Sequence, residues 1–245
     1  MFMDSKEALK HLLSLTRKAV QDYDLIKDGD HVCVGVSGGK DSMALLTVLA
    51  SLKRFYPKKF ELTAISISLG FDGMNFSPIT EYCESLGVKH VIVESRIKEI
   101  VFDIRNEQNP CALCANLRRG ALNDYARKNG CNVVALAHHK DDVIETAMLS
   151  LHYEGRFYCF PPETHLDRSG VTVIRPFIYV NEYEIKHYAS LGVFPTVENT
   201  CPMDKTSKRA EIKGIIKSLE KDNNMIKTNI FGAVKRGLWP EISGK

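Results

Sequence analysis

Residues 37–42, Ser-Gly-Gly-Lys-Asp-Ser, directly follow the apolar run 32–36 and combine the residue types that bind a chain of phosphates. Glycines let backbone N–H groups converge on an anion without interference from Cβ atoms, and the N-terminus of a following helix adds partial positive charge. Lys40 offers a mobile cation, and Asp41 can hold a metal ion bound to the phosphates. The common NTPase loop is a different pattern, because Val34 and Asp41 stand where it requires glycine and Ser/Thr.

Cysteines form the second group with chemical potential. Cys111 and Cys114 make a C-x-x-C pair where a loop turns into a predicted helix, so both sulfur atoms can face one metal. Cys201 lies in a polar, loop-like stretch. Three thiolates are one short of a closed zinc site but suit a [4Fe–4S] cluster with one open iron. A thioredoxin-like redox pair is the alternative, which the position of the motif after the third strand disfavours.

The other cysteines have a different interpretation. Cys33 and Cys131 fall inside predicted strands and Cys83 on a predicted helix, so we expect all three to be small buried hydrophobic residues. Cys159 lies in an aromatic loop, and its role stays open. Seven cysteines in an intracellular chain favour metal or redox use over a disulfide framework.

A parallel sheet would bring the phosphate loop and the later motifs to one edge. Near-continuous apolar strands alternate with helices, which predicts an α/β fold with helices on both faces of a parallel sheet. Ligands of such sheets bind beyond the C-terminal ends of the strands. The expected strands are residues 31–36, 60–68, 90–94, 131–137 and 171–178, and the expected helices are 1–23, 41–54, 77–86, 112–128, 141–152 and 181–191, with a basic helical tail over 207–236.

Composition limits the class of protein. The 245 residues carry a formal net charge of +3, so nucleic-acid binding would have to come from local patches. No apolar run approaches the roughly 20 residues that span a bilayer, and charged residues interrupt the N-terminus early, which predicts a cytoplasmic protein. We divide the chain into an N-terminal helix (1–26), a main domain (27–220) and a C-terminal helical tail (221–245).

Together these motifs resemble the PP-loop tRNA-thiolating enzymes, in particular their iron–sulfur branch, the tRNA 2-thiocytidine synthetases. The similarity extends from Asp28 to Ile216. It rests on an ordered series of blocks, namely residues 36–42, 111–120, 137–142, 160–162 and 174–177 and Cys201.

The resemblance implies a fold of the adenine nucleotide alpha hydrolase type, a [4Fe–4S] cluster, ATP and Mg²⁺. It implies that Cys111, Cys114 and Cys201 bind the cluster, whose open iron carries sulfur. The implied reaction adenylates the C2 oxygen of a cytidine, releases pyrophosphate, and replaces the activated oxygen with sulfur as AMP leaves. The implied ATP-binding residues are Ser37, Gly38, Gly39, Lys40, Asp41, Ser42 and His138.

Catalytic roles are expected for Lys40, Asp41, Arg118, Asp141 and Asp142. Asp141 and Asp142 open a predicted helix, so helix capping accounts for one of them, and the other can hold Mg²⁺ or water near the triphosphate. Arg118 lies one turn past Cys114 and either stabilises charge on the intermediate or belongs to a solvated helix face. For His138, ordinary packing is the alternative to nucleotide contact.

The implied macromolecular partner is tRNA, with an unpaired cytidine of the anticodon loop as its target. The aromatic stretch 157–160 can stack a base or fill a hydrophobic gap. A sulfur donor, either a cysteine desulfurase or inorganic sulfide, and a homodimer through the N-terminal helix complete the expected partners. Basic residues that follow Cys201 predict contacts with RNA phosphates: Lys205, Lys208, Arg209, Lys213 and Lys217.

Other functions use part of the same residues. A PP-loop ligase such as a tRNA lysidine synthetase keeps the loop but gives the cysteines no role. Sulfur insertion or removal on another base or small molecule would use the same groups. A non-catalytic iron–sulfur sensor could bind nucleotide and RNA, although a sensor does not need a pyrophosphate-binding loop.

Overall fold

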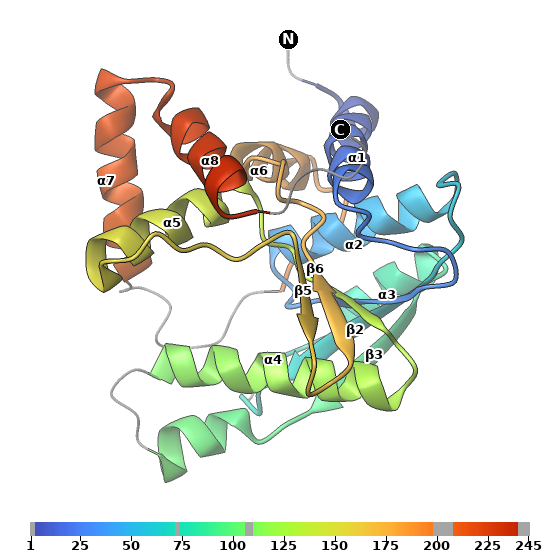
Figure 1. Cartoon of the computed structure of the whole chain (residues 1–245). Coiled ribbons are helices and arrows are strands. Elements are labelled where there is room, and N and C mark those ends of the chain that lie inside the picture. The colour runs from blue at the N-terminus through green and yellow to red at the C-terminus, as the bar shows by residue number, and fades with distance from the viewer. Residues whose placement is uncertain (1–2, 72–73, 106–109, 198–207, 240–245) are drawn as a thin grey trace.

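The structure is a computed structural model that describes residues 3–71, 74–105, 110–197 and 208–239 (Figure 1). Within these residues the strands form one six-stranded sheet in the order β3-β2-β1-β4-β6-β5. All neighbouring strands are parallel except β5, which pairs antiparallel with β6. The strands are β1 (His31–Gly35), β2 (Glu61–Ser68), β3 (Lys89–Glu94), β4 (Val133–Ala135), β5 (Glu163–Leu166) and β6 (Val171–Ile174).

Helices cover both faces of the sheet, as the sequence predicted (Figure 1). Because side chains alternate along a strand, Val32 and Val34 of β1 pack with α1, α2 and α6, whereas Cys33 faces α4 on the other side. No helix of the described residues has both the length and the apolarity to cross a bilayer. The helices are α1 (Ser5–Asp22), α2 (Lys40–Lys53), α3 (Ser77–Ser85), η1 (Glu99–Ile104, a π-helix), α4 (Pro110–Lys128), α5 (Lys140–Glu154), α6 (Glu182–Ser190), α7 (Lys208–Asp222) and α8 (Ile226–Gly237).

Three elements differ from the sequence prediction. The antiparallel strand β5 and the π-helix η1 were not expected, so the sheet is mixed and not wholly parallel. The basic tail consists of two helices, α7 and α8, instead of one continuous helix. The segment between β5 and β6 contains Gly170 with a φ of 62°, which is a local signal of the hairpin turn. The division into three regions stays a prediction.

The C-terminal helices pack on α5. Ile144 of α5 contacts Ile212 and Ile216 of α7 in a separate apolar cluster, which α8 completes from the other side. Beyond α8, the indole of Trp239 lies edge-on to Tyr23 at 5.9 Å between ring centres, and its N–H donates to the Phe160 carbonyl at 3.0 Å. Residues of α7, α8 and Trp239 therefore pack against α5 and against residues of the N-terminal region.

One carboxylate is buried where α5 meets α7. Glu145 is 4% exposed, and its oxygens lie 3.4 Å from the Lys213 Nζ and 3.6 Å from the Arg209 Nε. Burial raises the pKa of Glu145 from its ordinary 4.5 to about 7, because lost hydration outweighs the attraction of Lys213 and Arg209, and the charge of Asp142 adds to the rise.

This burial predicts a pH-dependent stability difference. The pKa of Glu145 is higher in the folded protein than in the unfolded chain. Between these two pKa values the folded protein therefore binds more protons than the unfolded chain, and its stability falls as the pH rises from the lower value to the higher one. Glu145→Gln does not titrate. We compare the free energies of unfolding of the variant and the wild type. The difference, variant minus wild type, should increase by on the order of 3 kcal/mol from pH 4.5 to pH 7.5. Urea unfolding at several pH values measures it, and a pH-independent difference would contradict the assignment.

Candidate active site

The loop of residues 37–42 connects β1 to α2 at the point where the strand order reverses, between β1 and β4. This is the position at which open α/β sheets bind their ligands. Gly38 has a φ of +84°, and a Cβ placed there would lie 3.0 Å from the Val197 Cβ. The Val197 N–H donates to the Gly38 carbonyl at 2.9 Å. Glycine is therefore required at this position both by the backbone and by its neighbour.

Ser42 shapes the loop from inside. Its hydroxyl accepts the Ser37 N–H at 3.1 Å and donates to the Gly39 carbonyl at 2.9 Å, and the residue is 5% exposed. Ser37 is exposed, and its hydroxyl lies 3.2 Å from the Ser42 hydroxyl. Gly39 is the N-cap of α2 and makes no side-chain cap bond, so the first N–H groups of the helix can donate to an anion.

Lys40 and Asp41 form the charged part of the loop. The Lys40 Nζ lies 2.9 Å from the Asp41 Oδ2 and 3.3 Å from the Glu182 Oε1. Burial acts to lower the pKa of Lys40, but the hydrogen bond to Asp41 and the two negative charges raise it overall, so this side chain stays a cation. The Asp41 Oδ1 also lies 3.9 Å from the His139 Nε2.

A pocket of about 330 Å³ lies between the loop and α4. This volume falls in the range of small-molecule sites. A Cβ at Gly35 would meet the Leu122 side chain at 2.8 Å, which shows how closely α4 approaches the end of β1. The residues around the pocket combine apolar and basic side chains, and they include Ser37, Ile65, Ile67, Ala115, Arg118, Arg119, Leu122, Leu136 and His138.

Two of the predicted cluster ligands lie on the same helix as this pocket wall. Cys111 and Cys114 occupy the first turns of α4, and the spacing of three residues puts them on one side. Ala115 and Arg118 continue that side into the pocket. Cys111 is exposed, whereas Cys114 is half-buried against the apolar cluster around Leu69.

The third predicted ligand, Cys201, lies outside the described residues. Val197, the last described residue before it, hydrogen-bonds to Gly38 of the loop. The structure therefore places Cys111 and Cys114 on the helix that borders the pocket, and the role of Cys201 stays a prediction.

The two adjacent histidines have different positions. His138 lines the pocket, and its ring centre lies 4.9 Å from that of Phe160. Burial lowers the pKa of His138 to about 4, with a smaller opposing effect from Asp142, so the imidazole is neutral at pH 7. Its Nδ1 is buried and has no hydrogen-bond partner among the described residues, which fits a polar atom that meets a ligand.

His139 instead caps α5. Its Nδ1 accepts the Asp142 N–H at 3.3 Å, and its own N–H donates to the Asp142 Oδ2 at 3.0 Å. The Asp142 Oδ1 also accepts from the Arg209 Nη1 at 2.8 Å. Asp142 thus performs the capping that the sequence assigned to one of the two aspartates.

Asp141 connects three helices. Its Oδ2 accepts the Glu182 N–H at 2.7 Å, and its Oδ1 lies 3.1 Å from the Lys227 Nζ of α8. Neither Asp141 nor Asp142 is among the residues that line the pocket. Both carboxylates have partners within the chain, and their catalytic role stays a prediction.

Arg118 and Arg119 line the pocket, whereas Arg209 and Lys213 of α7 are partly exposed and have carboxylate partners. Arg209 pairs with Asp142, and the Lys213 Nζ lies 3.4 Å from Glu145 and 3.6 Å from Glu182. Both cations have carboxylate partners within the chain, and their use in RNA binding stays a prediction. Sequence reasoning missed Glu182 itself, since no local pattern links it to a lysine so far away in the chain.

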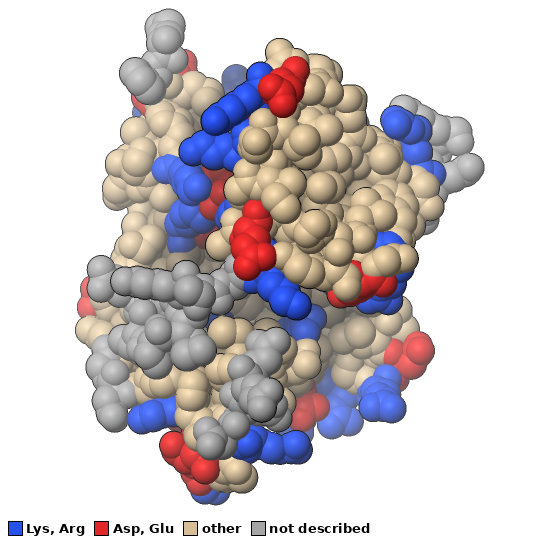
Figure 2. Space-filling view, turned by 90° about the vertical axis from the view of Figure 1, so that its left-hand side faces the viewer, with Lys and Arg blue, Asp and Glu red and all other residues tan. Residues whose placement is uncertain are grey.

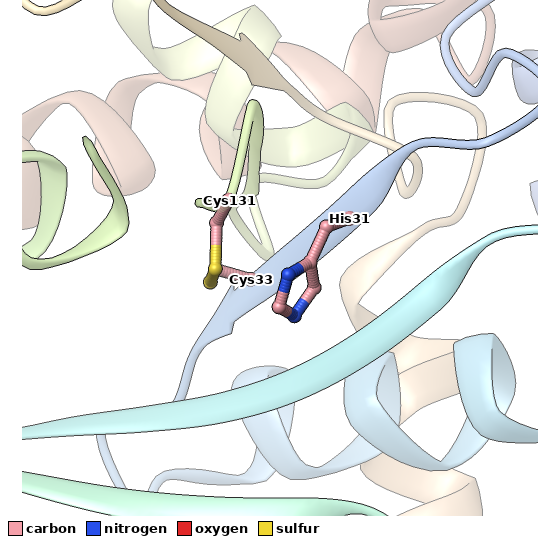
Figure 3. Close-up of side chains that lie close together, drawn as sticks. All are labelled: His31, Cys33 and Cys131. Atoms are coloured by element: carbon pink, nitrogen blue, oxygen red, sulfur yellow. A yellow bond between two sulfur atoms is a disulfide. The ribbon is translucent and has the colours of Figure 1, made fainter. Parts of the chain in front are cut away.

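Figure 3 shows a second group of possible metal ligands, at the other end of β1. The ligand atoms of His31, Cys33 and Cys131 lie within 4.8 Å of one another. The burial expected for both cysteines is confirmed, but they form a disulfide, so their interpretation as plain hydrophobic residues is wrong. Cys83 and Cys159 are buried thiols, and burial raises their pKa values to about 11 and about 12.

Comparisons with known proteins agree with this geometry. Residues 7–219 match the family described as PP-loop domain. The tRNA-cytidine(32) 2-sulfurtransferase of Dichelobacter nodosus is 38% identical over 238 residues, covering 96% of this chain and 89% of the relative. The protein of the same name from Geobacter sulfurreducens is 37% identical over 228 residues, covering 92% and 89%.

A solved structure is similar over almost the whole chain. It is the U34-tRNA thiolase NcsA from Methanococcus maripaludis with its [4Fe-4S] cluster, at a TM-score of 0.74 and 25% identity, covering 95% of this chain and 79% of that one. Fold, loop and sequence similarity agree. The chain belongs to the PP-loop family, in the group that contains the tRNA-cytidine(32) 2-sulfurtransferases.

Proposed function

We propose that this protein is an ATP-dependent tRNA sulfurtransferase that replaces the C2 oxygen of an anticodon-loop cytidine with sulfur. The observation that carries the proposal is the pocket that joins the phosphate loop to the cysteine-bearing side of α4. The wall formed by the phosphate loop has groups that bind phosphates. The wall formed by α4 belongs to the helix that carries Cys111 and Cys114. An enzyme that activates an oxygen and then replaces it needs both.

The phosphate loop supports the first half of the reaction. A carbonyl oxygen leaves poorly until it becomes a phosphate ester, so the base must first receive AMP. The open N–H groups at the start of α2 and the Lys40 ammonium stabilise the negative charge that gathers on the departing pyrophosphate. Asp41, half-exposed beside Lys40, is the residue that we assign to Mg²⁺.

Arg118 and His138 face the reacting base in this proposal. The Arg118 guanidinium can stabilise charge on the adenylated intermediate, and the unpaired Nδ1 of neutral His138 can hydrogen-bond the nucleotide or base. Ile65, Ile67 and Leu122 supply apolar surface around them. Such surface excludes water, which would otherwise hydrolyse the activated base.

The donor set fits an iron–sulfur cluster. Cys111 and Cys114 lie three residues apart on one side of α4, where both sulfur atoms can ligate one cluster. With Cys201 they make three ligands. When bound, a [4Fe–4S] cluster with three protein thiolates supplies an iron that carries the incoming sulfur.

The tRNA surface that we propose borders the pocket. Figure 2 shows the side of the molecule that carries α5 and α7, where lysine and arginine side chains gather among a few carboxylates. Phe157 and Tyr158 are exposed there, and Lys208 lies 4.8 Å from the Tyr153 ring. Exposed aromatic rings next to cations suit unpaired bases. Cysteine desulfurase or inorganic sulfide as sulfur donor, and a homodimer through α1, stay predictions.

The first test removes the loop cation. Lys40→Ala should lower tRNA-dependent formation of AMP from ATP by at least about 100-fold, because the developing pyrophosphate charge loses its cation. The visible absorbance of the cluster should not change. Lys53→Ala, at the far end of the same helix, is the matched control and should keep its activity. Loss of cluster absorbance in Lys40→Ala would show a folding role instead.

The second test concerns the thiols. Anaerobically purified protein should be brown with about four irons per chain, and Cys114→Ser should reduce this to less than one iron, since two thiolates do not retain the cluster. Iron analysis and visible spectra measure the result. Cys83→Ala, which changes a buried thiol of α3, should keep its iron. A colourless wild type holding one zinc ion would refute the cluster.

The third test identifies the base. Nucleoside mass spectrometry of tRNA from cells lacking the gene should show loss of 2-thiocytidine, and wild-type protein should restore it. The Lys40→Ala variant should fail to restore it. Loss of a different thiolated base would keep the enzyme class and replace the substrate, and unchanged thiolation would contradict the function.

A further inference from the structure

Lys40 belongs to a ring of polar contacts that joins the phosphate loop to α7. On the loop side, Lys40 contacts Asp41 at 2.9 Å, and Asp41 lies 3.9 Å from His139. The His139 backbone N–H donates to the Asp142 Oδ2 at 3.0 Å, and Asp142 pairs with Arg209 of α7 at 2.8 Å.

The return path runs through α7 and α6. Arg209 lies 3.6 Å from Glu145, and Glu145 lies 3.4 Å from Lys213, one turn further along α7. Lys213 lies 3.6 Å from Glu182 of α6, and Glu182 contacts Lys40 at 3.3 Å. Lys40, Glu182 and Lys213 thus form a continuous series of charged contacts from the loop to α7, so a change in one pair alters the next.

Glu182 is the branch point of this ring. Its carboxylate contacts Lys40, Lys213 and also Lys186 at 3.1 Å. Burial acts against its ionisation, but the hydrogen bond from Lys186 and the charges of Lys213 and Lys40 lower the pKa of Glu182 to about 2, so it is an anion. It therefore divides its negative charge among cations from three elements.

We infer that Glu182 is a positioning residue through which α7 controls the availability of Lys40 to phosphate. The inference rests on the proposed function, in which Lys40 binds the phosphates of ATP. Phosphate oxygens must compete with Glu182 for the Lys40 ammonium. The Lys213 cation weakens the hold of Glu182 on Lys40, because one carboxylate is shared. Binding at the loop and pairing at α7 then strengthen each other, as linkage requires.

The test is a double-mutant cycle read by the binding of inorganic pyrophosphate with Mg²⁺, measured by titration calorimetry on the full chain. In Lys213→Gln, the Glu182 carboxylate loses one of its three lysine partners and therefore binds the Lys40 ammonium more firmly. The Kd for pyrophosphate should rise about fivefold, the lower limit of an ordinary coupling. In a Glu182→Gln background, the same Lys213→Gln change should have no effect, because the shared charge is gone.

The controls distinguish this coupling through Glu182 from long-range charge attraction and from loss of structure. Lys221→Gln removes an exposed charge about two turns further along the same helix, outside the ring, and should leave the Kd unchanged. An equal loss of affinity on removing Lys213 in both backgrounds would show long-range attraction and overturn the inference. No loss in either would also overturn it. A wild type that does not bind pyrophosphate would instead remove the proposed function.

Discussion

Close backbone approach at two glycines, Gly35 at the end of β1 and Gly38 in the phosphate loop, is the constraint on which the rest of the site depends. A side chain at Gly35 would collide with Leu122 of α4, and one at Gly38 would press on Val197. These contacts hold the loop directly against the helix that carries Cys111 and against the residue that precedes the segment of Cys201. Backbone contacts of this kind fix the distance between phosphate site and thiols better than long side chains could.

Charge balance decides what packs around that loop. Asp141, Asp142 and Glu145 all lie near the start of α5, and lysine or arginine side chains of α7 and α8 pair with them. Buried pairs of this kind add little net stability, because desolvation offsets most of the attraction, but breaking one leaves an unpaired charge. Two effects therefore hold the C-terminal helices against the site. One is the cost of leaving these carboxylates unpaired, and the other is packing in the apolar cluster around Ile212.

Much of this could be predicted from sequence because its signals are local. The alternation of apolar strands with helices predicts the sheet. The positions of the glycine loop and the C-x-x-C pair along the chain then predict the edge of the sheet at which these motifs meet. The ion pair of Arg209 with Asp142 joins residues 67 positions apart, and the disulfide of Cys33 spans 98 positions. No periodicity in a single sequence encodes such partners. The four-residue strand β5 is too short to give a clear pattern.

The loop separates two environments that the proposed reaction needs at different steps. On one side lie the ring residues around Glu182 and Lys213, where charge is plentiful and pyrophosphate can be stabilised. On the other side lies the pocket with Ile67 and Leu122, whose side chains supply apolar surface. Adenylation requires the first environment, and replacement of oxygen by sulfur requires the second. A backbone of glycines can border both, since it adds neither charge nor apolar bulk to the boundary between them.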